Sequence, residues 1–420
     1  MKQRVWILNH YAASMHYSAG GRHYWFAKYL KRAGYEPIIF CSNTKHGVPE
    51  RFVDTEDLWT VLQDEQIDVP FILVKSSLYT SNGKDRVLNM VNFYKSVQKA
   101  AKQYANTYGK PDVILASSVH PLTLVAGERL AKLFGVPCIC EMRDLWPEAI
   151  VAYSSRIKRD SLPAKAMYAG ERWIYEHADA LIFTQEGGLD YVREKGWDTA
   201  HGGKIDMRRA HHINNGVDLD AFDENAREHP YPDEDMDDPE TIKVVYTGAI
   251  RRINNLGILV DAARHFSDPR MRLIVFGDGD ELETLRTRVD SEGIGNVVFK
   301  GRVSKVFIPS ILQRSDVNVV HWEMNPLVRV GESYNKAFEY YAAGKPVFYT
   351  IRPGYSIAER YGAGVITDGF TPQEIAAGIE GVVRLPEERR RDMAANARRV
   401  AEAYDFRVMT NTLIEIIESL

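Results

Sequence analysis

The chain of 420 residues has no apolar run of the roughly 18 residues that a membrane-spanning helix needs. Its first eight residues are basic and then apolar, but they are too few for a secretion signal and lead to no small-residue cleavage site. A positive excess is also missing, because 53 lysines and arginines stand against 57 acidic residues, a net charge of −4. We therefore expect a soluble, cytoplasmic protein that does not bind nucleic acid.

Cysteine is scarce as well, with only Cys41, Cys138 and Cys140. Three cysteines make no disulfide framework, and they do not form the sets of four ligands that a zinc site uses. Buried, reduced thiols are expected instead, which again favours a reducing cytoplasm.

The spaced glycine fingerprint of nicotinamide-binding domains is absent after the first apolar run. Gly277-Asp278-Gly279 lacks the third spaced glycine, and a turn that ends a strand explains it. A nicotinamide dehydrogenase is therefore disfavoured.

Short apolar runs alternate with helical stretches along the whole chain. Such runs indicate parallel strands whose two faces are both covered by helices. The predicted fold is α/β, with two doubly wound parallel-sheet, Rossmann-like domains facing across a cleft. They would span residues 1–214 and 215–404, with a last helix at 405–420 that packs back onto the first domain. The acidic, proline-rich segment 229–240 is interpreted as a solvated loop and not as a metal cluster.

Ligands of open parallel sheets bind at the carboxyl ends of the strands. In the first domain, Gly20-Gly21 precedes a helix and suits a phosphate or sugar, although a plain turn would use the same residues. His120 should lie in the cleft at the end of one strand. Glu141, Arg143 and Asp144 follow the next strand, where they would contact substrate or form an internal Arg–carboxylate bridge.

In the second domain, Arg251 and Arg252 follow a glycine turn and would suit a diphosphate, the alternative being an exposed loop pair. The richest stretch is residues 331–346, which predict a loop, a helix and a helix-ending glycine. The start of that helix offers free amides and a positive dipole end to a phosphate. Lys336 adds a full charge, and Glu339 lies on the same face one turn later.

Several motifs together resemble a known family. They are the opening loop and helix at 9–30, Arg143–Glu148, the linker His212–Asp218, Asn335–Pro346 and the final segment Ala403–Leu420. On these residues the chain resembles a family-four glycosyltransferase with the GT-B architecture, of the branch that builds bacterial surface polysaccharides. The resemblance implies a retaining enzyme that uses a nucleotide sugar as substrate, with neither a metal nor a cofactor.

The resemblance also implies roles for individual residues. The second domain would hold the donor, with the base near Gly301, the ribose on Glu339 and the diphosphate on the helix start. The family's first glutamate of a spaced pair falls on Gly331 here, so Glu332 or a backbone contact would replace it. The catalytic candidates are His120, Arg143, Asp144 and Glu332. The donor-binding candidates are Gly20, Gly21, Arg251, Arg252, Asn254, Arg302, Val303, Ser333, Asn335, Lys336 and Glu339.

We therefore expect transfer from a UDP-sugar to a lipid-linked or saccharide acceptor in surface polysaccharide biosynthesis. Two segments that mix basic and apolar residues, 85–110 and 155–173, are candidates for contact with the inner leaflet of a membrane, or are simply helices solvated on one face. The alternatives are a nucleotide-sugar epimerase and a non-catalytic nucleotide- or sugar-binding protein.

Overall fold

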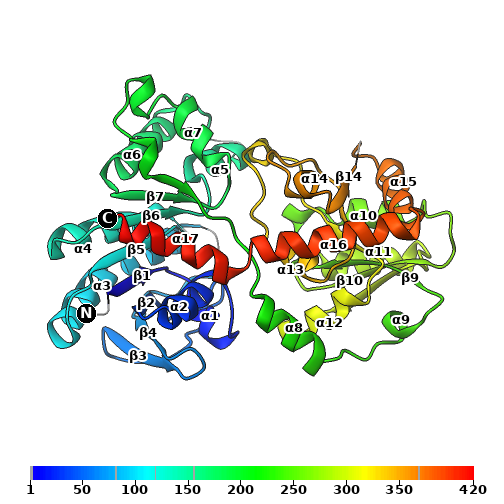
Figure 1. Ribbon diagram of the computed structural model, residues 1–420, viewed down its shortest axis with the longest axis horizontal. Coiled ribbons are helices and arrows are strands. Elements are labelled where there is room, and N and C mark those ends of the chain that lie inside the picture. The colour runs from blue at the N-terminus through cyan, green and yellow to red at the C-terminus, as the bar shows by residue number, and fades with distance from the viewer. Residues whose placement is uncertain (1–2, 81–82, 119, 155–156, 368) are drawn as a thin grey trace. The chain divides into compact units, whose positions relative to one another are not determined.

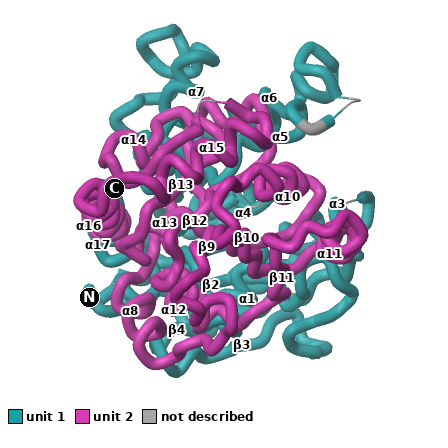
Figure 2. The backbone as a smooth tube through the Cα atoms, turned by 90° about the vertical axis from the view of Figure 1, so that its right-hand side faces the viewer, with its two compact units in different colours: residues 1–214, 406–420 teal, residues 215–405 magenta. Residues whose placement is uncertain are grey.

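The computed structural model describes residues 3–80, 83–118, 120–154, 157–367 and 369–420. The chain divides into two compact units. Unit 1 contains residues 1–214 and 406–420, and unit 2 contains residues 215–405 (Figure 2). Each unit is built on one sheet, parallel except for one edge strand in unit 1, with helices on both faces, which confirms the predicted class of two doubly wound α/β domains (Figure 1).

The sheet of unit 1 has eight strands in the order β3-β4-β2-β1-β5-β6-β7-β8. All neighbours pair in parallel except β3 and β4, which are antiparallel. The strands are β1 Arg4–Leu8, β2 Glu36–Ser42, β3 Trp59–Asp64, β4 Val69–Val74, β5 Val113–Ser117, β6 Cys138–Met142, β7 Ala180–Phe183 and β8 Ala210–His212. The longer helices are α2 Arg22–Arg32, α3 Lys84–Tyr108, α4 Pro121–Phe134, α5 Trp146–Tyr153, α6 Leu162–His177 and α7 Gly188–Glu194, and a short α1 covers Ala13–Tyr17.

The apolar runs form the central strands because helices cover both of their faces. Val5, Ile7 and Leu115 are fully buried, as two-sided burial in a parallel sheet requires. The C-terminal helix α17 (Phe406–Glu418) belongs to this unit and packs against α2. The rings of Phe26 and Phe406 meet edge to face at 5.6 Å between centroids.

The sheet of unit 2 has six parallel strands in the order β11-β10-β9-β12-β13-β14. The strands are β9 Ile242–Thr247, β10 Met271–Phe276, β11 Val297–Gly301, β12 Val317–Val320, β13 Val347–Tyr349 and β14 Gly364–Ile366. The main helices are α8 Leu219–Glu228, α10 Gly257–Ala263, α11 Leu282–Ser291, α12 Ile308–Gln313, α13 Asn335–Ala342, α14 Ile357–Tyr361, α15 Pro372–Val383 and α16 Glu387–Ala403. Two buried apolar clusters, one on each face of the sheet, form its core.

The acidic segment 229–240 is more ordered than the solvated loop that its composition predicts. It contains a short helix, α9 (Glu234–Asp237), which the side chain of Asp233 caps. Lys300 pairs with Asp233 and Asp235 at 2.8 and 2.6 Å. Paired carboxylates need not be solvated, so the segment packs on the domain instead of extending from it.

The three cysteines are buried, as expected, and each is free. Within the described ranges, no helix combines the length and the apolar character needed to cross a bilayer.

Candidate active site

The order of strands in unit 1 reverses between β1 and β5, so the loops after these two strands diverge and leave room for a ligand. His10 follows β1 and His120 follows β5, and their Nδ1 and Nε2 atoms lie 2.7 Å apart. Both side chains are fully buried, and His10 stacks on Phe93. His120 lies at the carboxyl end of β5, as predicted, but its imidazole is buried against His10 and is not exposed to solvent.

Burial and the nearby charge of Arg86 lower the pKa of His120 to about 3. Burial, together with the neighbouring His120, lowers the pKa of His10 well below its usual value. Both rings are consequently neutral at physiological pH, when each imidazole carries one proton-donating and one accepting nitrogen. His120 Nδ1 and His10 Nε2 are buried without a hydrogen-bond partner among the residues described. The catalytic role of His120 stays a prediction.

A second buried network surrounds Glu141, the fourth residue of β6. Arg22 Nε donates to Glu141 Oε2 at 2.8 Å, and His23 Nε2 lies 3.0 Å from Glu141 Oε1. Ser117 Oγ donates to the same Oε1 at 2.7 Å, and Asn9 Nδ2 lies 2.9 Å from His23 Nδ1. Burial alone would raise the pKa of Glu141, but the charges and hydrogen bonds of Arg22 and His23 hold that pKa well below its usual range.

The sequence did not single out Arg22 and His23. An internal Arg–carboxylate bridge was one of the two interpretations of the loop after β6, but the partner is Arg22 and not Arg143. Arg22 also donates from Nη2 to the carbonyl of Ile213 at 2.8 Å and from Nη1 to the carbonyl of Asn214. One guanidinium thus fixes the start of α2 to the last residues of unit 1.

The backbone turn before α2 accounts for the glycine pair. Gly21 has φ +114°, which side chains of L-residues rarely adopt, and an added Cβ would lie 3.0 Å from Met15 Cγ. A Cβ at Gly20 would lie 3.3 Å from the ring of Trp25. The close turn therefore requires glycine at position 21, and the expected contact of Gly20-Gly21 with donor phosphates stays a prediction.

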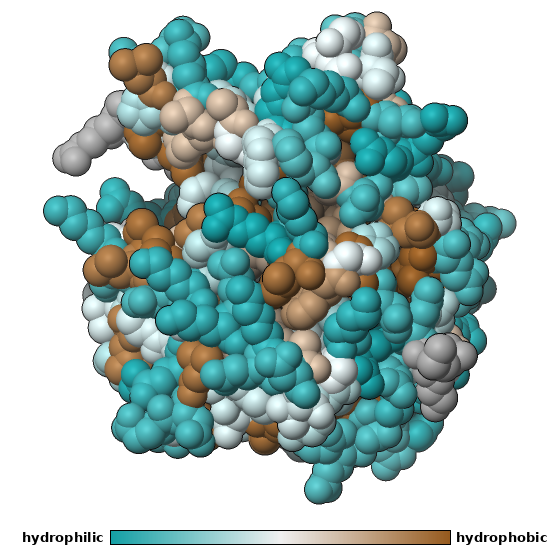
Figure 3. All heavy atoms as spheres, turned by 90° about the vertical axis from the view of Figure 1, so that its left-hand side faces the viewer, coloured by the Kyte–Doolittle hydropathy of each residue, from teal (hydrophilic) through white to brown (hydrophobic). Residues whose placement is uncertain are grey.

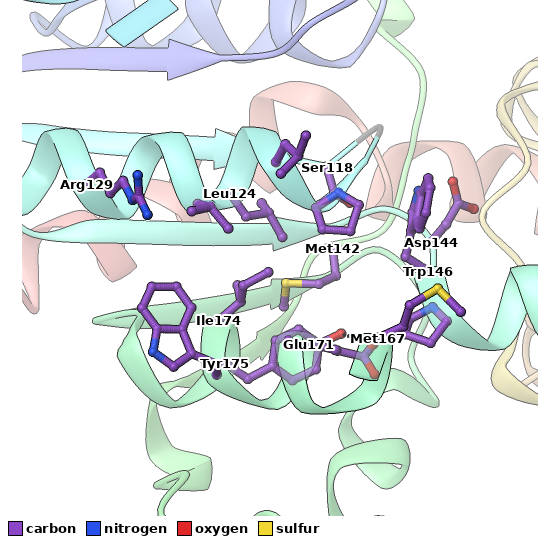
Figure 4. Close-up of a pocket in the computed structure, with 16 residues that line it drawn as sticks. Ser118, Leu124, Arg129, Met142, Asp144, Trp146, Met167, Glu171, Ile174 and Tyr175 are labelled. Carbon is purple, nitrogen blue, oxygen red and sulfur yellow. Dashed lines mark hydrogen bonds between the residues drawn. The ribbon is translucent and has the colours of Figure 1, made fainter. Parts of the chain in front are cut away.

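Arg143 and Asp144 are less enclosed than Glu141. The backbone of Arg143 is held on both sides, because its N–H donates to Ser118 Oγ at 3.0 Å and its carbonyl accepts from Thr184 Oγ1 at 3.1 Å. Its Nε is buried without a hydrogen-bond partner in the described part of the chain. Asp144 is exposed and lies at one end of a pocket between α4 and α6 (Figure 4). Both side chains are available to a ligand at the carboxyl end of β6.

In unit 2 the strand order reverses between β9 and β12, and Lys336 from the first turn of α13 reaches this point. Its Nζ donates to Tyr246 OH at 2.7 Å and lies 4.1 Å from the centroid of the same ring. A Cβ at Gly248 would lie only 2.9 Å from that nitrogen. The glycine after β9 thus leaves the space that the ammonium group occupies.

Two further cations lie in the loop after β9. Arg251 and Arg252 are exposed, and neither forms an ion pair with a described residue. Asn254 is turned inward, since its Nδ2 donates to the carbonyl of Ala249 at 2.8 Å and to Tyr246 OH at 3.2 Å. Asn254 therefore shapes the loop, while the two guanidinium groups stay available to an anion.

Glu339 lies on α13 one turn after Lys336 and is partly exposed. Burial raises its pKa, which the charges of Lys305 and Lys336 partly offset. Its carboxylate makes no hydrogen bond to any residue that the structure describes, so both oxygens can accept from a ligand. Lys305, whose charge acts on Glu339, belongs to the segment that follows β11. In the same segment Arg302 is exposed and Val303 packs on the core.

Glu332 has different surroundings. It is buried, and its Oε2 accepts from Tyr349 OH at 2.5 Å while its Oε1 accepts from the N–H of Ile357 at 2.8 Å. Burial raises its pKa to about 7. These contacts give the carboxyl group a structural role at the start of α14, and the predicted catalytic role has no geometric support in this unit.

The start of α13 is open to a ligand. Its N-cap residue, Tyr334, provides no side-chain acceptor for the first amides, and Asn335 is exposed. Ser333 Oγ is buried without a partner among the described residues, while its carbonyl accepts from Asn215 Nδ2 at 2.7 Å. Asn215, from the linker motif, thus holds the loop that leads into this helix.

Each unit of the chain matches a family of glycosyltransferase domains. Residues 20–201 match the family described as glycosyl transferase 4-like domain, and residues 233–400 match glycosyl transferases group 1. The two matches together span most of both units, so the chain belongs to the group 1 glycosyltransferases and has their two-domain GT-B fold. None of the curated proteins matches this sequence.

Three solved structures illustrate the fold. A sucrose-phosphate synthase from Thermosynechococcus elongatus is 18% identical, with a TM-score of 0.72 over 100% of this chain and 99% of that one. Anabaena HepE in complex with UDP-glucose is 17% identical, with a TM-score of 0.66 over 99% and 100% of the two chains. An α,α-trehalose 6-phosphate synthase from Burkholderia multivorans is 14% identical, with a TM-score of 0.69 over 100% and 99%. At these identities the likeness concerns the fold.

Proposed function

We propose that this glycosyltransferase transfers a sugar from a UDP-sugar to a lipid-linked or saccharide acceptor, with retention of the anomeric configuration and without a metal. It would act at the cytoplasmic face of the inner membrane, in the assembly of surface polysaccharide. The observation that carries the donor half is the set of Lys336, Glu339 and the open start of α13 at the switch point of unit 2. HepE, with the same fold, holds UDP-glucose.

Each group of this set matches one part of a nucleoside diphosphate. The carboxylate of Glu339 would accept charge-assisted hydrogen bonds from the two ribose hydroxyls. The first amides of α13, aligned with the helix dipole, would bind diphosphate oxygens. The base would lie against the backbone of Arg302 and Val303.

The same cations would assist the reaction itself. When the glycosidic bond to UDP breaks, negative charge develops on the leaving phosphate oxygen. Lys336, held in place by Tyr246, would stabilise that charge together with Arg251 and Arg252, as a fixed electrostatic environment does in other transferases. The protein would thus supply the positive charge that a bound metal supplies elsewhere.

The acceptor half rests on unit 1. Arg143 and Asp144 lie at the carboxyl end of β6 with groups available to a ligand. Exposed apolar side chains occur in both basic segments proposed for membrane contact, with Leu88 61% exposed on α3 and Leu162 81% exposed on α6. Ser155 and Arg156 of the second segment lie outside the described residues.

Turnover separates the proposal from its rivals. The protein would be incubated with UDP-sugars, with and without an extract of lipid-linked saccharides, and released UDP and product configuration would be measured by a coupled assay and NMR. We expect UDP release that depends on acceptor, persists in EDTA and gives a retained linkage. An isomeric UDP-sugar formed without acceptor would identify an epimerase, and UDP binding without turnover would identify a non-catalytic binder.

A further inference from the structure

Unit 1 contains an apolar pocket of about 480 Å³ that the donor site does not use. It runs between α4 and α6, with Met142 from the end of β6 on its floor (Figure 4). Leu124 and Val125 line one side, and Met167 and Ile174 line the other. The volume lies within the range of roughly 300–1,000 Å³ typical of small-molecule sites.

The two ends of the pocket differ from its middle. Asp144 and Ser118 lie at the end nearest the carboxyl edge of the sheet, and Arg129 lies at the other end (Figure 4). Between them the lining is mainly aliphatic and aromatic. Glu171 also borders the pocket, but its carboxyl group already accepts hydrogen bonds from Tyr175 OH at 2.9 Å and from Tyr191 OH at 2.7 Å. The middle therefore offers few hydrogen-bonding groups to an occupant.

The apolar surface continues out of the pocket along α6. Trp173, near the end of this helix, borders the pocket and is 42% exposed. On the end of the molecule that Figure 3 presents, brown apolar side chains interrupt the polar surface. Trp173 thus extends the apolar lining of the pocket to the surface of the unit.

The polarity of the pocket identifies the chemistry of its occupant. A peptide segment would bury backbone N–H and C=O groups against a lining that cannot pair them, at a substantial free-energy cost. A free sugar would leave its hydroxyls unpaired in the same way. An aliphatic chain has no such groups, and its polar head would lie at the carboxyl edge, where domains of this fold bind their ligands.

We propose that the pocket between α4 and α6 holds the aliphatic chain of an amphiphilic acceptor, whose polar head lies beside Ser118 and Asp144. The inference rests on the proposed function, since it assigns the acceptor to the lipid-linked class and not to free saccharides. The head would then lie next to Arg143 at the end of β6, and the chain would run along α6 toward Trp173 and the end of the pocket at Arg129.

Gly170 provides a variant that fills the pocket without straining the fold. It lies on α6, lines the pocket, and an added Cβ would meet no atom within 4 Å. Gly170→Phe therefore places a ring in or across the cavity. Gly381 on α15 of unit 2 is also a helical glycine with nothing within 4 Å, so Gly381→Phe makes the same chemical change away from the pocket.

The test is a calorimetric titration of the full-length protein with octyl, decyl and dodecyl β-D-maltoside, each below its micelle concentration. Affinity should rise about fourfold for each added methylene group until the pocket is full. Gly170→Phe should abolish this dependence on chain length, and Gly381→Phe should keep it. Equal affinity for all three chains, or an unchanged series in Gly170→Phe, would overturn the inference.

Two further measurements keep the outcomes apart. UDP titrated into the same proteins reports the donor site, so failure to bind UDP counts against the proposed function, while a flat alkyl series with intact UDP binding counts against the pocket alone. Sedimentation identifies a competing occupant. A dimer that Gly170→Phe converts to monomer, without any alkyl binding, would show that a second copy fills the pocket and would also overturn the inference.

Discussion

Replacing Glu141 with glutamine is expected to lower the free energy of unfolding by about 3–5 kcal/mol. The side chains of Arg22 and Glu141 are only 1% and 0% exposed, and Arg22 Nη2 lies 2.7 Å from Glu141 Oε2. Glutamine keeps the volume and one acceptor oxygen but leaves the guanidinium charge buried without a counter-charge. The large cost arises from that unpaired charge and not from the loss of one hydrogen bond.

The pH dependence has a definite sign. Because the folded pKa of Glu141 is depressed below its unfolded value of about 4.3, the ion pair contributes stability above that pH and loses it as pH falls through the folded pKa. The Glu141→Gln protein should therefore lose stability less steeply than the wild type in acid.

Urea unfolding followed by tryptophan fluorescence measures the effect, with Glu50→Gln as the control. Glu50 pairs with Lys45 at 2.6 Å, but the two side chains are 59% and 41% exposed. That change should cost at most about 1 kcal/mol and should depend on salt, whereas the cost at Glu141 should not. Combining Glu141→Gln with Arg22→Met should recover part of the loss. If Glu141→Gln costs no more than Glu50→Gln, the buried ion pair does not stabilise the unit as argued.

Three further changes test other parts of the structure. Lys336→Met should lower the rate of UDP release by about 10²–10³ with little change in the urea midpoint, and an undiminished rate would exclude Lys336 from leaving-group stabilisation. Burial raises the pKa of Glu171 to about 7, so the contribution of this group to stability is complete below about pH 4.3 and is lost as pH rises through 7. The free energy of unfolding in urea should therefore fall less between acid and alkaline pH in Glu171→Gln than in the wild type. An unchanged fall would contradict the assignment. Gly21→Ala should lower the free energy of unfolding by about 1–2 kcal/mol, because position 21 has a φ of +114°. The control Gly381→Ala should leave that free energy unchanged or raise it. Equal effects of the two changes in urea unfolding would argue against strain at Gly21.

Much of the fold could be predicted because parallel strands buried on both faces are continuous apolar runs. The exceptions have local causes. The edge strand β3 is half-exposed and pairs in antiparallel fashion, so it lacks the apolar run that marks its neighbours. Strand β4 contains Pro70, a residue that central strands rarely tolerate, and this hides an otherwise apolar segment.

In the candidate site, residues close together in the sequence could be predicted to lie together, and residues far apart in the sequence could not. Lys336 and Glu339 lie in one helical turn, so periodicity alone places them on one face. Arg22 and Glu141 are 119 residues apart, and His10 and His120 are 110 apart. Nothing in the local pattern pairs such residues, because it is the strand order of the finished sheet that brings them together.

The most direct measurement is a calorimetric titration of UDP, GDP, ADP and CMP into the wild type, Glu339→Ala and the control Glu388→Ala. Glu388 is exposed on α16 of the same unit. UDP should bind selectively, should lose about tenfold or more in affinity in Glu339→Ala, and should bind Glu388→Ala as it binds the wild type. Absence of UDP binding, or equal affinity in all three proteins, would contradict the assignment of the donor site to α13.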